Sequence, residues 1–114
     1  MTDCIFCRIA QGELDASIVS QDDEFVAFHD VSPQAPVHVL IIPRRHVETL
    51  LDVPVDQFDL LGRMQLKAIE VARELGLADS GFRLVTNCLE GGGQSVFHIH
   101  MHLLGGRKLE WPPG

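Results

Sequence analysis

Short runs of β-branched and aromatic residues, bounded by turn-forming residues, recur along the chain and predict strands. The expected strands span residues 17–20, 25–28, 37–42, 82–88 and 96–104. The first two predict a hairpin, because only an acidic turn separates them. Pro43 ends the third, since proline has no N–H for a ladder. Apolar residues recur at helical spacing over 54–75, which predicts one long helix that ends at Gly76. Residues 4–10 predict one short helical turn.

Strands grouped around one long helix indicate an α+β fold with a five-stranded antiparallel sheet. The helix has two apolar faces, because one side carries Phe58, Leu61, Ala68, Ala72 and Leu75, and another carries Leu60, Met64 and Val71. One sheet surface covers only one such face. The second face therefore favours a homodimer, with packing against loops of the same chain as the alternative.

Composition narrows the class of protein. The 114 residues contain no linker or repeat, which predicts one domain over 1–114. A net charge of −7 argues against binding a nucleic acid polymer or an anionic membrane. The start Met1-Thr2-Asp3 lacks the basic and apolar regions of an export signal, and no apolar run approaches the roughly 20 residues of a membrane span. We therefore expect a cytoplasmic protein whose three cysteines are reduced thiols or metal ligands.

Three of the six histidines alternate with apolar residues at His98, His100 and His102. On a strand, this spacing places all three imidazoles on one face. A solvated surface row is one explanation, but the clustering favours metal binding or catalysis. The three histidines together can hold zinc. The preceding loop Gly91-Gly92-Gly93-Gln94-Ser95 favours phosphate instead, because it offers backbone N–H groups and a hydroxyl donor to an anion.

The run His98-Ile99-His100-Met101-His102-Leu103-Leu104 resembles the signature of the histidine triad (HIT) superfamily. The similarity extends over nearly the whole chain, through Ile5-Phe6, Phe28-His29-Asp30, residues 32–36, His38, residues 92–95 and the tail 105–114. These segments resemble the Hint branch, the histidine triad nucleotide-binding proteins. The fragile histidine triad branch is less similar, as is the uridylyltransferase branch, which has glutamine at the position of His102.

The resemblance implies a HIT-like fold whose sheet continues across a homodimer. It also implies a purine nucleoside phosphoramidase, which cleaves the P–N bond of adenosine 5'-phosphoramidate or of AMP joined to an amine such as lysine. His100 would attack the phosphorus and form a nucleotidyl-histidine, a step that requires no cofactor. A nucleotide-binding regulatory module with incidental hydrolysis, and a zinc-binding protein that uses the strand histidines, are the alternatives.

The same resemblance implies roles for further residues. His102, Ser95 and His38 join His100 as catalytic residues. The expected nucleotide-binding residues are Phe6, Phe28, His29, Asp30, Val31, Asn87, Gly93, Gln94 and Ser95. The tail that carries Trp111 is expected to extend toward the partner's active site, or else to plug its own surface.

Cys4-Ile5-Phe6-Cys7 supplies two thiols at the spacing of half a tetrahedral zinc site. Some bacterial histidine triad proteins and the uridylyltransferases are similar in using two cysteines and two histidines for structural zinc. His46 and His98 are the matching histidines, and the site would be separate from catalysis. The alternative is a pair of reduced cysteines in an N-terminal turn.

Overall fold

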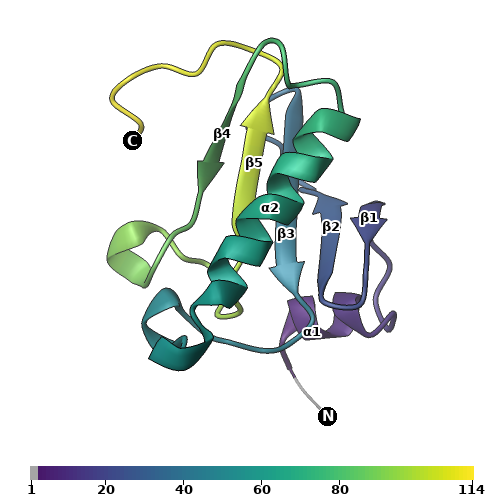
Figure 1. The fold of residues 1–114 in the computed structure, drawn as a ribbon, viewed down its shortest axis with the longest axis vertical. Helices are drawn as coiled ribbons and strands as arrows, with labels where there is room; N and C mark the ends of the chain where they lie inside the picture. The colour runs from purple at the N-terminus through teal and green to yellow at the C-terminus, as the bar shows by residue number, and fades with distance from the viewer. Residues whose placement is uncertain (1–2) are drawn as a thin grey trace.

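The computed structural model describes residues 3–114, and their strands form an antiparallel sheet in the order β1-β2-β3-β5-β4. The strands are β1 (Ile18–Gln21), β2 (Phe25–His29), β3 (Val37–Pro43), β4 (Phe82–Val85) and β5 (Met101–Gly105), the α-helices are α1 (Ile5–Ala10) and α2 (Asp59–Glu74), and the single-turn 3-10 helices are η1 (Leu50–Asp52), η2 (Val55–Gln57) and η3 (Glu90–Gly92). Figure 1 shows α2 across one face of the sheet and α1 near the end of β3. The predicted α+β fold is confirmed.

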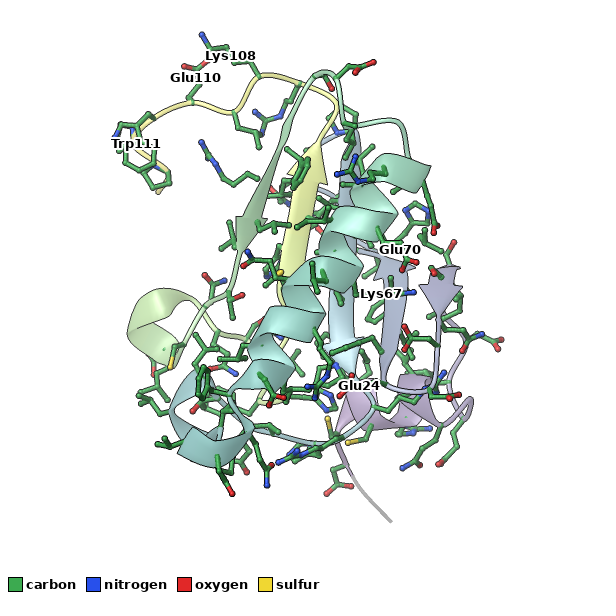
Figure 2. The ribbon with its side chains drawn as sticks, viewed as in Figure 1. Glu24, Lys67, Glu70, Lys108, Glu110 and Trp111 are labelled. Carbon is green, nitrogen blue, oxygen red and sulfur yellow. The ribbon has the colours of Figure 1, made fainter. Side chains whose placement is uncertain are left out.

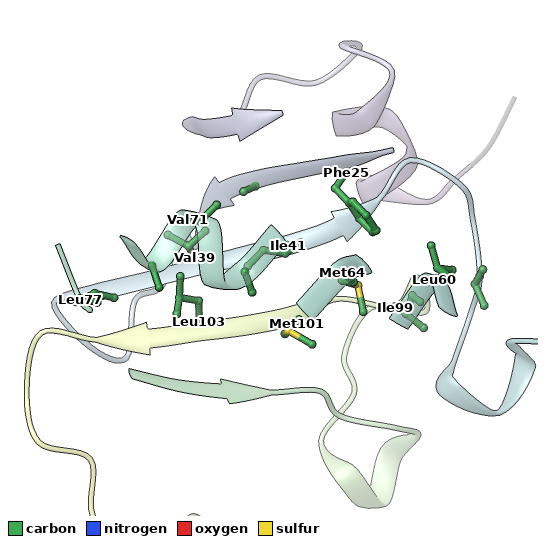
Figure 3. Packing of buried hydrophobic residues seen from close by; sticks show 14 residues of the cluster. Phe25, Val39, Ile41, Leu60, Met64, Val71, Leu77, Ile99, Met101 and Leu103 are labelled. Carbon is green, nitrogen blue, oxygen red and sulfur yellow. The ribbon is translucent and has the colours of Figure 1, made fainter. Parts of the chain in front are cut away.

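Alternating side chains of β2 and β3 build a hydrophobic cluster on each face of the sheet. The cluster beneath α2 takes Phe25, Ala27, Val39 and Ile41 from these strands (Figure 3). The cluster on the opposite face takes Val26, Phe28, Leu40 and Ile42, and α1 adds Phe6 and Ala10. Met101 and Leu103 of β5 also lie beneath α2. His102 between them therefore points to the face that α1 covers.

The last strand is shorter than predicted, because it begins at Met101 and not at Val96. β3 pairs with β5 from Val37 opposite Gly105 to Ile41 opposite Met101. Continuing this register places Ile99 opposite Pro43, which has no N–H to donate. The Ile99 N–H instead donates to the Val47 carbonyl at 2.7 Å. The segment before Met101 is thereby released from the sheet.

The other expected boundaries also shift. The strand predicted over 82–88 ends at Val85, where its pairing with β5 ends at His102. The helix predicted over 54–75 is divided into η2 and α2. The two apolar faces predicted for it merge in part, because Ala68 and Ala72 lie in the same core cluster as Leu60, Met64 and Val71.

Met1 and Thr2, on which the expectation of a missing export signal partly rests, lie outside the described residues. Within residues 3–114, no helix combines the length and the apolar character needed to cross a membrane.

Candidate active site and metal centre

His100 lies just before β5 and is buried. Its Nδ1 is 2.8 Å from the backbone oxygen of His98. A carbonyl oxygen only accepts, so this contact assigns the proton to Nδ1 and leaves the lone pair on Nε2. No hydrogen bond joins Nε2 to the described residues, and none of their fully buried polar side-chain atoms lacks a partner. Nε2 is therefore open to the adjoining cavity.

That cavity has a volume of about 290 Å³ and lies on the sheet face covered by α1. It is lined by Ile5, Phe6, Ile9, Phe28, Asp30, Val31, Leu40, Ser95, Val96, His100 and His102. The Phe6 ring stands edge-on to His100, with the ring centroids 5.0 Å apart. A second hollow of about 370 Å³ shares Ile5, Ile9, Phe28, Asp30 and Val31 with the first and extends it toward His29. Together they form an apolar slot that ends at the histidines.

A chain of hydrogen bonds assigns the proton of His102. The Gln34 N–H donates to His38 Nδ1 at 3.0 Å, so the His38 proton is on Nε2. This Nε2 lies 2.9 Å from His102 Nδ1 and donates to it. The proton of neutral His102 is consequently on Nε2. Asp30 lies beside this chain, with Oδ2 3.5 Å from His38 Nε2 and Oδ1 accepting from the Ser32 N–H at 2.7 Å.

Both cavity histidines are neutral at pH 7. Burial lowers the pKa of His100 below its ordinary value, although the hydrogen bond to His98 and the charge of Asp30 oppose this effect. Burial also lowers the pKa of His102 to about 4, and the neighbouring His100 and His38 act in the same direction. A neutral His100 is a nucleophile with an available lone pair. A neutral His102 is a hydrogen-bond donor through Nε2.

The predicted phosphate loop is only partly at the cavity. Ser95 lines it, whereas Asn87 does not, and the Asn87 side-chain nitrogen lies 3.8 Å from the point that a Cβ atom on Gly93 would occupy. Gly93 has φ +88°, a conformation that favours glycine. The Gln94 side chain is wholly engaged by the protein, since its amide donates to the Glu48 and Val96 carbonyls and accepts from the Leu89 N–H. Its backbone is the part of Gln94 that stays available to a nucleotide, so the expected role of Gln94 remains a prediction for the backbone.

Cys4, Cys7, His46 and His98 converge at the end of β3, and their ligand atoms all lie within 4.8 Å of one another. The Cys7 sulfur is 3.2 Å from His46 Nδ1 and 3.5 Å from His98 Nδ1, and the two Nδ1 atoms are 3.2 Å apart. A tetrahedral zinc ion, with bonds of about 2.0 Å to nitrogen and 2.3 Å to sulfur, holds its ligands about 3.3 to 3.8 Å apart. The four side chains therefore fit zinc.

The protonation of His98 also suits a metal ligand. Its Nε2 is 2.7 Å from the Pro43 carbonyl, so Nε2 carries the proton and Nδ1 presents its lone pair to the sulfurs. Burial lowers the pKa of His98 to about 4, which keeps the ring neutral. A backbone carbonyl that orients a ligand histidine in this way is typical of metal sites.

The three alternating histidines do not form one zinc site, so that alternative is wrong. His98 turns toward the cysteines, and His102 toward His38. Asp30, His38 and His102 also lie within metal-binding distance of one another, but Nε2 of His38 carries a proton and cannot be a ligand while Gln34 donates to Nδ1. The Cys4–Cys7–His46–His98 cluster is thus the better metal centre among residues 3–114.

Sequence reasoning missed several apolar residues that line the slot, namely Ile9, Leu14, Leu40 and Val96. Alternation along β3 provides a signal for Leu40, which lies opposite His102 in the sheet. A larger surface hollow of about 500 Å³ lies between α2 and the β1–β2 turn. It contains none of the predicted site residues, and its Lys67 and Arg63 are paired with acidic side chains.

Comparison with known proteins agrees with this geometry. The family model described as HIT domain matches residues 11–109. The chain belongs to the HIT family. It is 50% identical over 105 residues to the purine nucleoside phosphoramidase of Escherichia coli strain K12. This match covers 92% of this chain and 88% of that protein. It is also 51% identical over 112 residues to a HIT-like protein of Synechocystis, with 98% and 97% covered.

Solved structures of HIT proteins have the same fold. The HIT family hydrolase of Legionella pneumophila is 51% identical and superposes with a TM-score of 0.95. The match covers 98% of this chain and 100% of the hydrolase. A histidine triad protein of Clostridium difficile is 41% identical with a TM-score of 0.94, covering 96% of each chain. The predicted resemblance to the histidine triad superfamily is confirmed.

Proposed function

We propose that this HIT protein, as a single domain over 1–114, is a hydrolase of purine nucleoside phosphoramidates such as adenosine 5'-phosphoramidate or AMP-lysine. The observation that carries the proposal is the open Nε2 of His100, whose Nδ1 proton is held by the His98 carbonyl at the end of an apolar slot. The relationship to the Escherichia coli purine nucleoside phosphoramidase supports the choice of substrate.

The reaction has two displacements at phosphorus. His100 Nε2 attacks, a P–N bond to the histidine forms, and the P–N bond to the amine breaks. The leaving amine takes a proton from the neighbouring donors, for which His102 Nε2–H, Ser95 and His38 are the available groups. Water then attacks the phosphorus of the nucleotidyl-histidine, the P–N bond to His100 breaks, and a proton of the water returns to the group that protonated the amine, which releases AMP and restores the site. Neutral donors at His102 and Ser95 stabilise the charge that develops on the phosphoryl oxygens.

The slot orients the nucleotide for this attack. Phe6 and Phe28 are buried aromatic walls against which a purine base can pack. Asp30 accepts hydrogen bonds from the ribose hydroxyls, since its carboxylate lies at the junction of the two hollows. His29 and Val31 border the outer end of the slot. Gly93 offers its backbone to the phosphate, and Asn87, whose side chain lies beside Gly93, is proposed to lie near the phosphate and the sugar.

We further propose that a structural zinc ion is held by Cys4, Cys7, His46 and His98. The ion would cross-link these segments and stabilise the folded protein, and it would take no part in bond cleavage. We also propose a cytoplasmic location, as the sequence predicts, because a reducing compartment would keep Cys4 and Cys7 in the thiol form that binds zinc.

We also propose that the protein is a homodimer in which β4 pairs with its counterpart. β4 is an edge strand with half-buried Leu84 and Val85, and Phe58 of the segment before α2 is 63% exposed. An uncovered apolar edge favours association with a second copy. The tail carrying the exposed Trp111 extends away from its own sheet (Figure 2), in a position to reach the partner.

The first test measures AMP release from adenosine 5'-phosphoramidate by the wild type and by His100→Ala. We expect the substitution to lower kcat by roughly a thousandfold or more, because the covalent route is lost. AMP binding, measured by calorimetry, should persist in His100→Ala. Equal kcat values would refute the nucleophile assignment, and AMP binding without turnover by the wild type would favour the regulatory module.

A further inference from the structure

Helix α1 contributes to both the metal cluster and the nucleotide slot. Cys4 caps the helix, its sulfur accepting from the Cys7 N–H at 3.4 Å, and Cys7 is buried one turn later. Between them, Phe6 points the other way, against His100 and Phe28. Ile5 and Ile9 of the same helix complete the apolar wall of the slot. The same turn of helix therefore carries two metal ligands and the wall that faces the base.

His98 is a second connection between the two sites. Its ring nitrogen Nδ1 faces the Cys4 and Cys7 sulfurs at 3.4 and 3.5 Å. Its backbone carbonyl accepts the Nδ1 proton of His100 at 2.8 Å. Because this segment lies outside the sheet, the described backbone anchors near it are few, chiefly the Ile99 N–H to the Val47 carbonyl. A displacement of the His98 backbone would move the carbonyl that assigns the His100 tautomer.

We propose that the Cys4–Cys7–His46–His98 cluster is a positioning element for the nucleotide site, so that metal occupancy sets both nucleotide affinity and the tautomer of His100. The inference rests on the phosphoramidase and zinc-site proposals above and goes beyond them, because it makes the metal centre a determinant of ligand binding. It assigns Cys4, Cys7 and His98 as positioning residues that do not touch the substrate.

Metal occupancy can affect the nucleotide site because α1 is short and carries two of the four metal ligands. A helix of six residues is not stable by itself, so its position depends on what anchors it. Apolar packing of Phe6 and Ala10 anchors one side, and the metal cluster anchors the other. Without an ion, hydrogen bonds hold His46 Nδ1, His98 Nδ1 and the Cys7 sulfur at 3.2 to 3.5 Å from one another, whereas a bound ion would hold all of them at once. Loss of the ion therefore weakens the anchor of α1 and of the His98 segment.

The expected coupling is about tenfold, within the range typical of linked sites and of groups that orient a ligand. The affinity for AMP should therefore weaken about tenfold when zinc is removed with a chelator. By reciprocity, saturating AMP should tighten zinc binding by the same factor. The second measurement uses the folded, zinc-loaded protein and a competing chromophoric chelator, so it remains informative if the metal-free protein unfolds.

Two variants separate this coupling from general stability. Cys4→Ser removes a metal ligand but keeps an oxygen that caps α1, and it should reproduce the weaker AMP binding at a zinc concentration that saturates the wild type. Cys88→Ser alters the cysteine outside the cluster and should change neither affinity. Nitrogen-15 NMR of His100 should show one tautomer in the zinc-loaded protein and a mixture in Cys4→Ser.

The outcomes distinguish the proposals. If the protein takes up no stoichiometric zinc, both the metal site and the coupling are wrong, while the phosphoramidase assay is unaffected. If zinc binds but AMP changes its affinity by less than twofold, and the His100 tautomer is unchanged in Cys4→Ser, the metal site stands and the coupling is refuted. A tenfold reciprocal change together with a mixed tautomer supports the coupling.

Discussion

The evenly spaced histidines His98, His100 and His102 have three different environments. They differ in which ring nitrogen the protein engages and which it leaves available. His98 donates from Nε2 to a carbonyl and faces the sulfurs, whereas His100 donates from Nδ1 and faces the cavity. His102 accepts at Nδ1 and donates from Nε2. Since the hydrogen-bond partner of one imidazole nitrogen decides what the other nitrogen can do, these contacts support the three proposed roles of metal ligand, nucleophile and hydrogen-bond donor.

The depressed pKa of His102 predicts a loss of stability in acid. Its pKa is about 4 in the folded protein and about 6.5 when unfolded, so between these values the unfolded chain binds more protons. This contribution is complete above pH 6.5 and is lost as the pH falls toward 4. Lowering the pH from 7 to 4.5 should therefore reduce the unfolding free energy of the wild type about 2 kcal/mol more than that of His102→Gln.

Denaturant unfolding of both proteins at several pH values tests this prediction. The glutamine keeps an oxygen that accepts from His38 Nε2, and losses that both proteins share cancel in the difference. Parallel curves for the two proteins between pH 7 and 4.5 would show that His102 does not titrate abnormally.

At the scale of elements, α2 is joined to the first hairpin by a buried lysine. The Lys67 amine is 2.9 Å from the Glu70 carboxylate, 3.4 Å from Asp22 and 2.9 Å from the Ser20 hydroxyl. Figure 2 shows Lys67 and Glu70 on the side of α2 that faces this hairpin. Burial alone would lower the pKa of Lys67, but the bonds to Glu70 and Asp22 outweigh it and raise the pKa. The lysine therefore remains charged.

We predict that the stem of Lys67 matters more than its charge. Lys67→Met keeps the apolar stem and leaves two half-exposed carboxylates to water, so it should lower the unfolding free energy by less than about 1 kcal/mol. Lys67→Ala also removes the stem and should cost about 2 kcal/mol. Urea unfolding of the two variants compares these losses, and an equal loss would show that the ion pairs dominate.

At the scale of the molecule, the two edges of the sheet differ in their surroundings. β1 forms one edge and β4 the other, and each has an apolar residue of similar exposure, Ile18 at 40% and Phe82 at 37%. β4 lies on the side of the tail with Trp111, whereas β1 lies near α1 (Figure 1). The proposed dimer uses only the β4 edge, which makes the β1 edge a matched control.

Phe82→Lys should therefore shift the protein from dimer to monomer at micromolar concentration, because a charged side chain on an edge strand opposes pairing with a second copy. Ile18→Lys should leave the dimer intact. Sedimentation velocity distinguishes the two states. A wild type that sediments as a monomer, or a dimer that Ile18→Lys dissociates, would contradict the β4 interface.

Local patterns determined much of this protein. Residues 25–28 and 37–42 carry enough alternation and turn chemistry for β2 and β3 to be predicted nearly to the residue. The histidine run identified the family, and the resemblance also selected His46 and His98 as companions of the cysteines. Such features are predictable because strand formation and motif chemistry depend on neighbours in the sequence.

The tertiary structure alone decided where the last strand begins and which nitrogen each histidine exposes. The start at Met101 follows from Pro43 in a strand more than 50 residues away, and the environment of His98 follows from cysteines 91 and 94 residues away. The hydrogen bonds of the Gln94 side chain to the backbone of Glu48, Leu89 and Val96 also form only in the folded protein. Contacts of this kind depend on how distant segments dock, which no local period encodes.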